Sequence, residues 1–126
     1  MGVIGRVTTG GEAKVALVVR SGEGREREIE SLVDTGFNGS LALPTHRIDK
    51  LGLSLVGRER MLLASGDLHF TRTYRAFVEL DGQVYSVRVV EGGEPLIGMT
   101  LLWGYDLHVQ CKAGGSVVVE AHSREP

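Results

Sequence analysis

The residues best suited to chemistry in this chain lie where an apolar run ends abruptly in an acid. Residues 29–33 are apolar except for one Glu and one Ser, and Asp34, Thr35 and Gly36 follow directly. Gly36 permits the positive φ of a sharp turn, and Thr35 can bond its hydroxyl across that turn. A carboxylate at the end of a buried strand is costly unless something pairs with it or uses it. Asp34 is therefore the strongest candidate for a functional residue.

A second segment completes a two-part pattern with this turn. Residues 95–102 read Pro-Leu-Ile-Gly-Met-Thr-Leu-Leu, and the first motif continues through Phe37 to the Leu-Ala-Leu-Pro of residues 41–44. The two segments resemble aspartic proteases of the retropepsin-like branch, in the small bacterial form with one Asp-Thr-Gly per chain. An Asp-Thr-Gly triplet alone recurs by chance, whereas both segments in order are a far more specific signal. The resemblance spans about residues 29–120.

The resemblance implies a fold, a reaction and an assembly. The fold is all-β, a small closed or semi-closed barrel with one or two short helices, and the activity is that of an aspartic endopeptidase. Two carboxyls that share one proton can activate a water and protonate the reacting amide, because like charges a few Å apart cannot both ionise. The chain supplies one such carboxyl, so a homodimer would bring Asp34 of each copy together at a two-fold axis.

The resemblance also assigns roles around Asp34. Thr35 would bond across the two-fold axis, and Gly36 would leave its backbone open to a peptide or protein substrate. A hairpin at Ala64, Ser65 and Gly66 would form a flap over that substrate.

The remaining site residues of the resemblance are structural. The residues expected to support the site from below are Ile97, Gly98, Leu101 and Leu102. One position departs from the pattern, because Phe37 stands where relatives carry a small or hydroxylated residue and cannot donate a hydrogen bond to the acid.

Two other interpretations remain open. The chain could be a non-catalytic dimeric β-barrel that binds extended peptides or a protein partner. It could also be a β-barrel binding module in which Asp34 is an ordinary turn aspartate bonded to its own backbone.

Bulk properties narrow the classes of function. The 126 residues fit one domain, predicted over 1–120 with a polar tail at 121–126, and the net charge of −2 favours neither nucleic acid nor an anionic membrane. Cys111 is the single cysteine, and the four histidines show no metal-ligand spacing, so we expect no metal and no cofactor. No apolar run approaches the length of a membrane span, which favours a cytoplasmic protein.

The elements that must position Asp34 are short strands separated by glycine turns. Alternation and apolar runs predict strands over the ranges 3–8, 13–19, 25–33, 40–43, 60–64, 68–80, 83–90, 96–97, 107–111 and 116–120. A brief helix should begin with Thr45 as its N-cap, bury Ile48 and Leu51, and end at Gly52. Residues 100–103 should form one helical turn.

Overall fold

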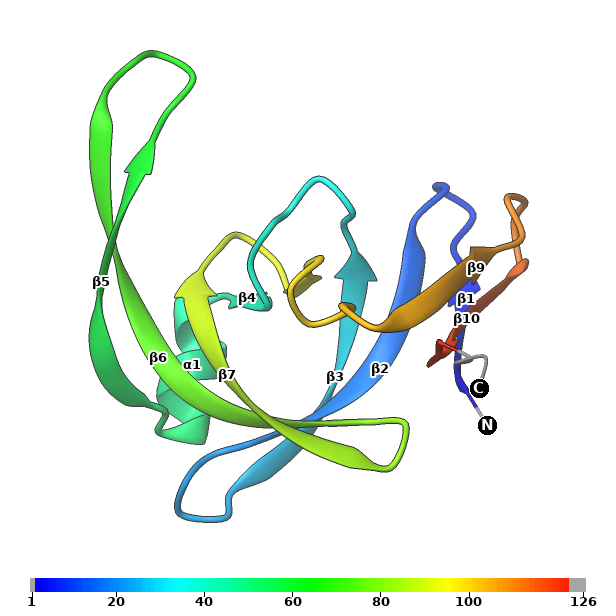
Figure 1. Cartoon of the computed structure of the whole chain (residues 1–126), viewed down its shortest axis with the longest axis horizontal. Coiled ribbons are helices and arrows are strands. Elements are labelled where there is room, and N and C mark those ends of the chain that lie inside the picture. The colour runs from blue at the N-terminus through cyan, green and yellow to red at the C-terminus, as the bar shows by residue number, and fades with distance from the viewer. Residues whose placement is uncertain (1, 123–126) are drawn as a thin grey trace.

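The computed structural model describes residues 2–122, which form strands and one short helix (Figure 1). This confirms the predicted predominance of β-structure. The elements are β1 (Val3–Val7), β2 (Ala13–Arg20), β3 (Glu26–Val33), β4 (Leu41–Leu43), α1 (Thr45–Leu51), β5 (Ser54–Leu62), β6 (Leu68–Leu80), β7 (Gln83–Glu91), β8 (Leu96–Ile97), β9 (Tyr105–Val109) and β10 (Ser116–Ala121).

Six of the strands close into a ring of hydrogen-bonded pairs. The order β2-β6-β7-β4-β8-β3 returns to β2, because β6 pairs with β2 as well as with β7. Most pairs are antiparallel, but β3 pairs in parallel with β8, and β4 pairs in parallel with β7. Parallel pairs need long crossover connections, so each joins segments that are distant in sequence.

Apolar side chains from all sides of the ring fill its interior. The largest fully buried side chains are Leu17, Ile29, Leu41, Leu43, Ile48, Leu80 and Ile97, with Val15, Val19, Val78, Val89 and Val117. Alternate residues of β2, β6 and β7 contribute to this core, as the period of two in a strand requires. The core therefore fixes the register of the strands that end near Asp34.

Helix α1 packs on the core through Ile48 and Leu51, as the sequence predicts, and Gly52 ends it in the left-handed conformation with φ 67°. The predicted N-cap is wrong. Pro44 occupies the capping position in extended conformation, and Thr45 is the first helical residue. The Thr45 hydroxyl instead donates to Glu91 Oε2 at 2.9 Å. A proline at the cap fixes the φ that the chain needs there, although it offers no capping oxygen.

Two parts of the sheet extend beyond the ring. Strands β1, β10 and β9 continue the sheet on one side, and β9 is its edge. On the other side β5 and β6 form a long hairpin that projects past the ring (Figure 1). Strand β5 begins at Ser54, six residues before the predicted strand, because Gly57 and a bulge at Val56 hide its alternation.

The ends of the described chain are paired. Ala121 lies opposite Tyr105 in the β9–β10 pair, so the sheet continues one residue into the predicted tail. The rest of that tail, 123–126, lies outside the described residues. No helix within residues 2–122 is long and apolar enough to cross a membrane.

Candidate active site

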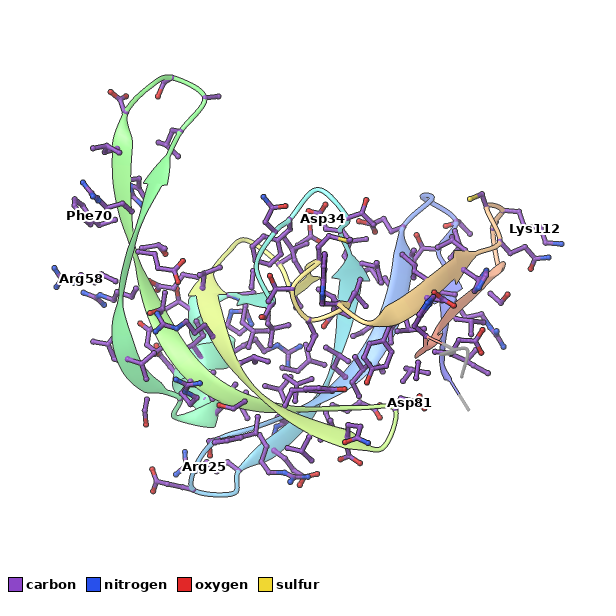
Figure 2. All side chains as sticks on the ribbon, viewed as in Figure 1. Arg25, Asp34, Arg58, Phe70, Asp81 and Lys112 are labelled. Atoms are coloured by element: carbon purple, nitrogen blue, oxygen red, sulfur yellow. The ribbon has the colours of Figure 1, made fainter. Side chains whose placement is uncertain are left out.

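The turn at Asp34 begins where β3 leaves its parallel partner β8. Leu32 lies opposite Leu96 and Val33 opposite Ile97, and the Asp34 amide then donates to the Ile97 carbonyl at 2.9 Å. Figure 2 shows Asp34 near the crest of the turn that follows β3. The parallel pair thus fixes the backbone of the acid at the end of a strand.

The turn itself is closed by its own backbone. The Gly36 amide donates to Asp34 Oδ1 at 2.9 Å, and the Phe37 amide donates to the Asp34 carbonyl at 3.1 Å. Asp34 is half-buried, whereas Thr35 and Gly36 are exposed. One carboxylate oxygen is therefore held by the turn, and the residues that follow it face solvent.

The second predicted segment does lie against this turn. The Met99 amide donates to the Phe37 carbonyl at 2.8 Å, and the Thr100 amide donates to the Gly39 carbonyl at 3.1 Å. The Gly98 amide donates to Ser40 at 3.0 Å, and the Thr100 hydroxyl donates to the Asn38 carbonyl. The two parts of the sequence pattern therefore form one hydrogen-bonded unit.

Gly98 is required where this unit is tightest. A Cβ at this position would lie 2.1 Å from the Gly39 carbonyl oxygen and 2.7 Å from both the carbonyl oxygen and Cδ2 of Phe37. A Cβ on Gly39 would in turn lie 2.6 Å from Cζ of Phe37. The Phe37 ring thus packs between two glycines and supports the loop by packing rather than by a hydrogen bond.

The other predicted support residues belong to the core. Ile97, Leu101 and Leu102 are buried, and the Leu102 amide donates to the Gly98 carbonyl at 3.2 Å within a series of turns. They hold the second segment in place from the interior. Their burial is consistent with a structural role, which stays a prediction.

The structure does not place the predicted flap residues on the Asp34 turn. Ala64, Ser65 and Gly66 lie at the tip of the β5–β6 hairpin, which projects well away from that turn (Figure 1). The hydrogen bonds of the tip are local: Leu63 donates to Asp67 at 2.9 Å, and Gly66 donates to Leu63 at 2.9 Å. The hairpin is confirmed, and its closure stays a prediction.

A depression of about 180 Å³ lies between the base of this hairpin and the Asp34 loop. Its lining residues are Phe37, Gly39, Ser40, Leu41, Glu59, Arg88, Val90 and Thr100. The Arg88 guanidinium and the Glu59 carboxylate lie 3.7 Å apart here. The hairpin and the loop thus enclose one concavity that has apolar walls and an exposed ion pair.

Sequence reasoning missed Glu59 and Arg88. Glu59 lies in the run Arg58-Glu59-Arg60, and Arg88 alternates with buried valines in β7. In the β5–β6 register Glu59 lies opposite Thr71, so its side chain and the flanking arginines point to opposite faces. Figure 2 shows Arg58 and Phe70 on the side of the hairpin that faces away from Asp34. The sequence signal that could have identified Glu59 is an acidic residue between two basic residues.

Among the described residues, no three His, Cys, Asp or Glu side chains are arranged to hold a metal ion. Comparison with known proteins gave no matching family model and no matching curated protein.

Proposed function

We propose that the chain is an aspartic endopeptidase of the retropepsin-like type, which acts as a homodimer with Asp34 of each copy in one composite site. The fold proposed with it is the retropepsin-type barrel, and the closed ring of six hydrogen-bonded strands supports this part of the proposal. Peptide or protein chains in extended conformation are the proposed substrates.

One observation carries the proposal. The Asp-Thr-Gly turn and the distant Ile-Gly segment are bonded to each other through Asp34 to Ile97, Phe37 to Met99 and Gly39 to Thr100. An ordinary aspartate turn is closed by hydrogen bonds among its own residues and does not require bonds to a distant segment. These backbone bonds fix the turn at the end of β3, and within the turn the Gly36 amide donates to one oxygen of the Asp34 carboxylate.

The chemistry follows from placing two such carboxyls side by side. One would be ionised and would take a proton from the attacking water, while the other would donate its proton to the reacting amide. The proton would then belong to the pair, so the activity would follow two macroscopic pKa values. Thr35, exposed beside the acid, is available to bond to the partner subunit.

The substrate would lie along the depression between Phe37 and Arg88. An extended peptide is held mainly by main-chain hydrogen bonds, with alternate side chains in pockets. The β5–β6 hairpin would close over it and exclude bulk water from the carboxyl pair. Residues 64–66 at the hairpin tip would then move toward the Asp34 turn.

The test is cleavage of a diverse peptide library by concentrated protein between about pH 4 and 7, the range that brackets a proton-sharing carboxyl pair. Asp34→Asn keeps an oxygen for the Gly36 amide and removes the ionisable group, so we expect a folded protein with no cleavage. Asp81→Asn is the matched control, because Asp81 lies in the β6–β7 turn with φ 50°, a conformation that Asn adopts well.

Cleavage that survives Asp34→Asn would contradict the proposal. Binding of extended peptides without any cleavage that depends on Asp34 would assign the alternative, a dimeric barrel that binds peptides or a partner protein without catalysis.

A further inference from the structure

The β5–β6 hairpin carries most of the exposed apolar side chains. Among the described residues, eight large hydrophobic side chains are exposed, and five of them belong to this hairpin: Leu55, Val56, Leu63, Leu68 and Phe70. Phe70 is 61% exposed and Leu68 is 60% exposed. Single apolar side chains scattered over a surface need no explanation, whereas a group on one element marks a surface that contacts another molecule.

The register of the hairpin places three arginines on the same face as Phe70. Arg60 lies opposite Phe70, and Arg58 lies opposite Arg72 in the next pair on this face. Directly opposite residues share a face of an antiparallel pair, as do residues two apart on one strand. Figure 2 shows Arg58 and Phe70 on the side of the hairpin that faces away from Asp34. This surface, the outer face of the hairpin, consists of Arg58, Arg60, Leu68, Phe70 and Arg72.

Opposite cations elsewhere in the sheet have a carboxylate nearby. Arg88 lies opposite Arg75, and the Glu59 carboxylate is 3.7 Å from Arg88. Lys14 lies opposite Arg6, and a glutamate carboxylate is 3.8 Å from Lys14. In both pairs an acid therefore offsets part of the repulsion.

The outer face of the hairpin lacks such an acid. Within residues 2–122, the ion pairs of the structure include none of its three arginines. Arg58 and Arg72 thus lie opposite each other without compensation, although like charges directly opposite weaken a strand pair. Proteins break such local rules of stability mostly at functional sites. An anionic partner is the expected source of compensation.

The chemistry of the outer face selects the kind of partner. Guanidinium groups bind carboxylates and phosphates through paired hydrogen bonds. Phe70 and Leu68 require apolar groups against them, which a polypeptide supplies and a sugar-phosphate backbone does not. The net charge of −2 gives the chain no long-range attraction to nucleic acid or to an anionic membrane. An acidic polypeptide that also carries apolar side chains meets all three conditions.

We propose that the outer face of the hairpin binds an extended acidic segment of a partner protein. Carboxylates of that segment would pair with Arg58, Arg60 and Arg72, and an apolar side chain between them would cover Phe70. An extended chain presents every second side chain on one side, about 7 Å apart. The same spacing separates Leu68, Phe70 and Arg72 along β6, so one segment can follow the strand.

This surface is separate from the candidate active site and does not depend on a peptidase activity. It shares no residue with the depression beside the Asp34 loop, which Glu59 lines from the other face of β5. Binding can therefore be measured in Asp34→Asn protein, in which no peptide should be cut. Loss of the proposed peptidase would leave this inference in place, and loss of peptide binding at the hairpin would leave the peptidase in place.

The probe is a short fluorescent peptide of repeated Leu-Leu-Glu-Glu, which presents both residue types on each side when extended. One control peptide has Lys in place of Glu, and another has Ser in place of Leu. Fluorescence anisotropy measures the binding of each peptide to Asp34→Asn protein. We expect the first peptide to bind, and the affinity of both controls to be lower by about tenfold or more.

Substitutions locate the bound peptide. Arg58→Gln combined with Arg72→Gln should weaken binding by about tenfold, and Phe70→Ser should have a similar effect. Arg6→Gln is the matched control, because Arg6 is an exposed strand arginine that lies opposite Lys14 in β1, outside the hairpin. Its affinity for the peptide should equal that of the unsubstituted protein.

Arg58→Glu separates binding from folding. A glutamate opposite Arg72 replaces a repulsive pair with an attractive one, so we expect slower hydrogen exchange at the amides of the hairpin together with loss of peptide binding. Faster exchange would show that the arginine pair does not weaken the hairpin, which would overturn the argument from charge.

The proposal is also overturned if the acidic peptide does not bind, or if the Lys peptide binds equally well. Binding that is unchanged by the substitutions at Arg58 and Arg72 would place the peptide elsewhere on the molecule. Polyuridine RNA and vesicles that contain phosphatidylserine are measured alongside. If either binds in a manner that depends on Arg58 and Arg72 and the acidic peptide does not, the occupant of the outer face is a nucleic acid or a membrane instead of a protein.

Discussion

The turn at Asp34 and the turn at the tip of the β5–β6 hairpin use similar residues but are held in different ways. The first reads Asp-Thr-Gly and the second Ser-Gly-Asp, and each is closed by a short side-chain contact. The Asp34 turn is also bonded to a segment more than 60 residues away, through Ile97, Met99 and Thr100. The hydrogen bonds that close the hairpin tip join residues within 63–67.

Because of this difference, we expect the Asp34 turn to be rigid and the hairpin tip to be mobile. A turn tied to a distant strand opens only when that strand pair opens, whereas a locally closed turn can open by itself. The first is suited to hold a reacting carboxyl in place, and the second to a segment that must admit and release a chain. Four substitutions test this division, in order of decreasing effect.

Gly98→Ala should have the largest effect. The new methyl would overlap the Gly39 carbonyl at 2.1 Å, so the two segments must separate. We expect a loss of about 3 kcal/mol or more in the free energy of unfolding, with loss of any peptidase activity. Urea denaturation measures it. Gly93→Ala is the control, since a Cβ there meets nothing within 4 Å. Similar stability of the two variants would show that the Asp34 turn is not held by this contact.

Thr100→Val removes a hydrogen bond between the two segments and keeps the shape of the side chain. Its hydroxyl donates to the Asn38 carbonyl, so we expect a loss of about 1 kcal/mol in the same denaturation experiment. Thr45→Val is the matched control, because its hydroxyl is also exposed and donates to Glu91 rather than to the Asp34 loop. An equal loss from both variants would argue against a special role of the segment contact.

Gly66→Ala should affect the hairpin tip alone. Gly66 has φ 89°, which a residue with a Cβ adopts at a cost of about 1 kcal/mol. Because the tip can open locally, we expect faster hydrogen exchange at the Leu63 and Gly66 amides and little change at Asp34. Gly10→Ala, at a surface turn without positive φ, should leave exchange at the tip unchanged. Faster exchange that reaches Asp34 would join the two regions into one cooperative unit.

Ser65→Ala should have the smallest effect. The Ser65 hydroxyl donates to Asp67 Oδ2 at 3.1 Å and accepts from the Asp67 amide at 3.4 Å, both exposed. We expect a change within about 0.5 kcal/mol in overall stability, as for most surface substitutions. Thermal unfolding followed by circular dichroism measures it. A loss comparable to that of Thr100→Val would contradict the local character of the tip.

Much of the fold could be predicted because its signals are local. Glycine turns and alternation located most strands, and Gly52 marked the end of α1 correctly. The first half of β5 was missed because the bulge at Val56 interrupts the period of two. Residue preference alone predicts Thr45 as the N-cap of α1, whereas Pro44 occupies the N-cap position in the structure. The pairing of β2 with β6, which closes the ring, has no local signal at all.

In the candidate site, too, some contacts could be predicted from the sequence and others could not. The contact of the Asp34 turn with residues 97–102 could be predicted from a two-part sequence pattern. The support that Phe37 gives by packing between Gly39 and Gly98 could not, because it depends on distances between segments. Glu59 and Arg88 meet across the β5–β6–β7 strands, so neither position indicates the other in the sequence.

The parallel pair of β3 with β8 also sets an order of events during synthesis of the chain. Leu32 and Leu96 are 64 residues apart, so the ribosome makes Asp34 long before it makes the strand that holds it. Until residues 96–100 emerge, the Asp34 amide lacks the Ile97 carbonyl as its acceptor, and the bonds from Met99 and Thr100 to the turn cannot form. A nascent or truncated chain that lacks residues 96–100 therefore carries Asp34 without the segment that holds its turn. The site can form only after these residues have been made.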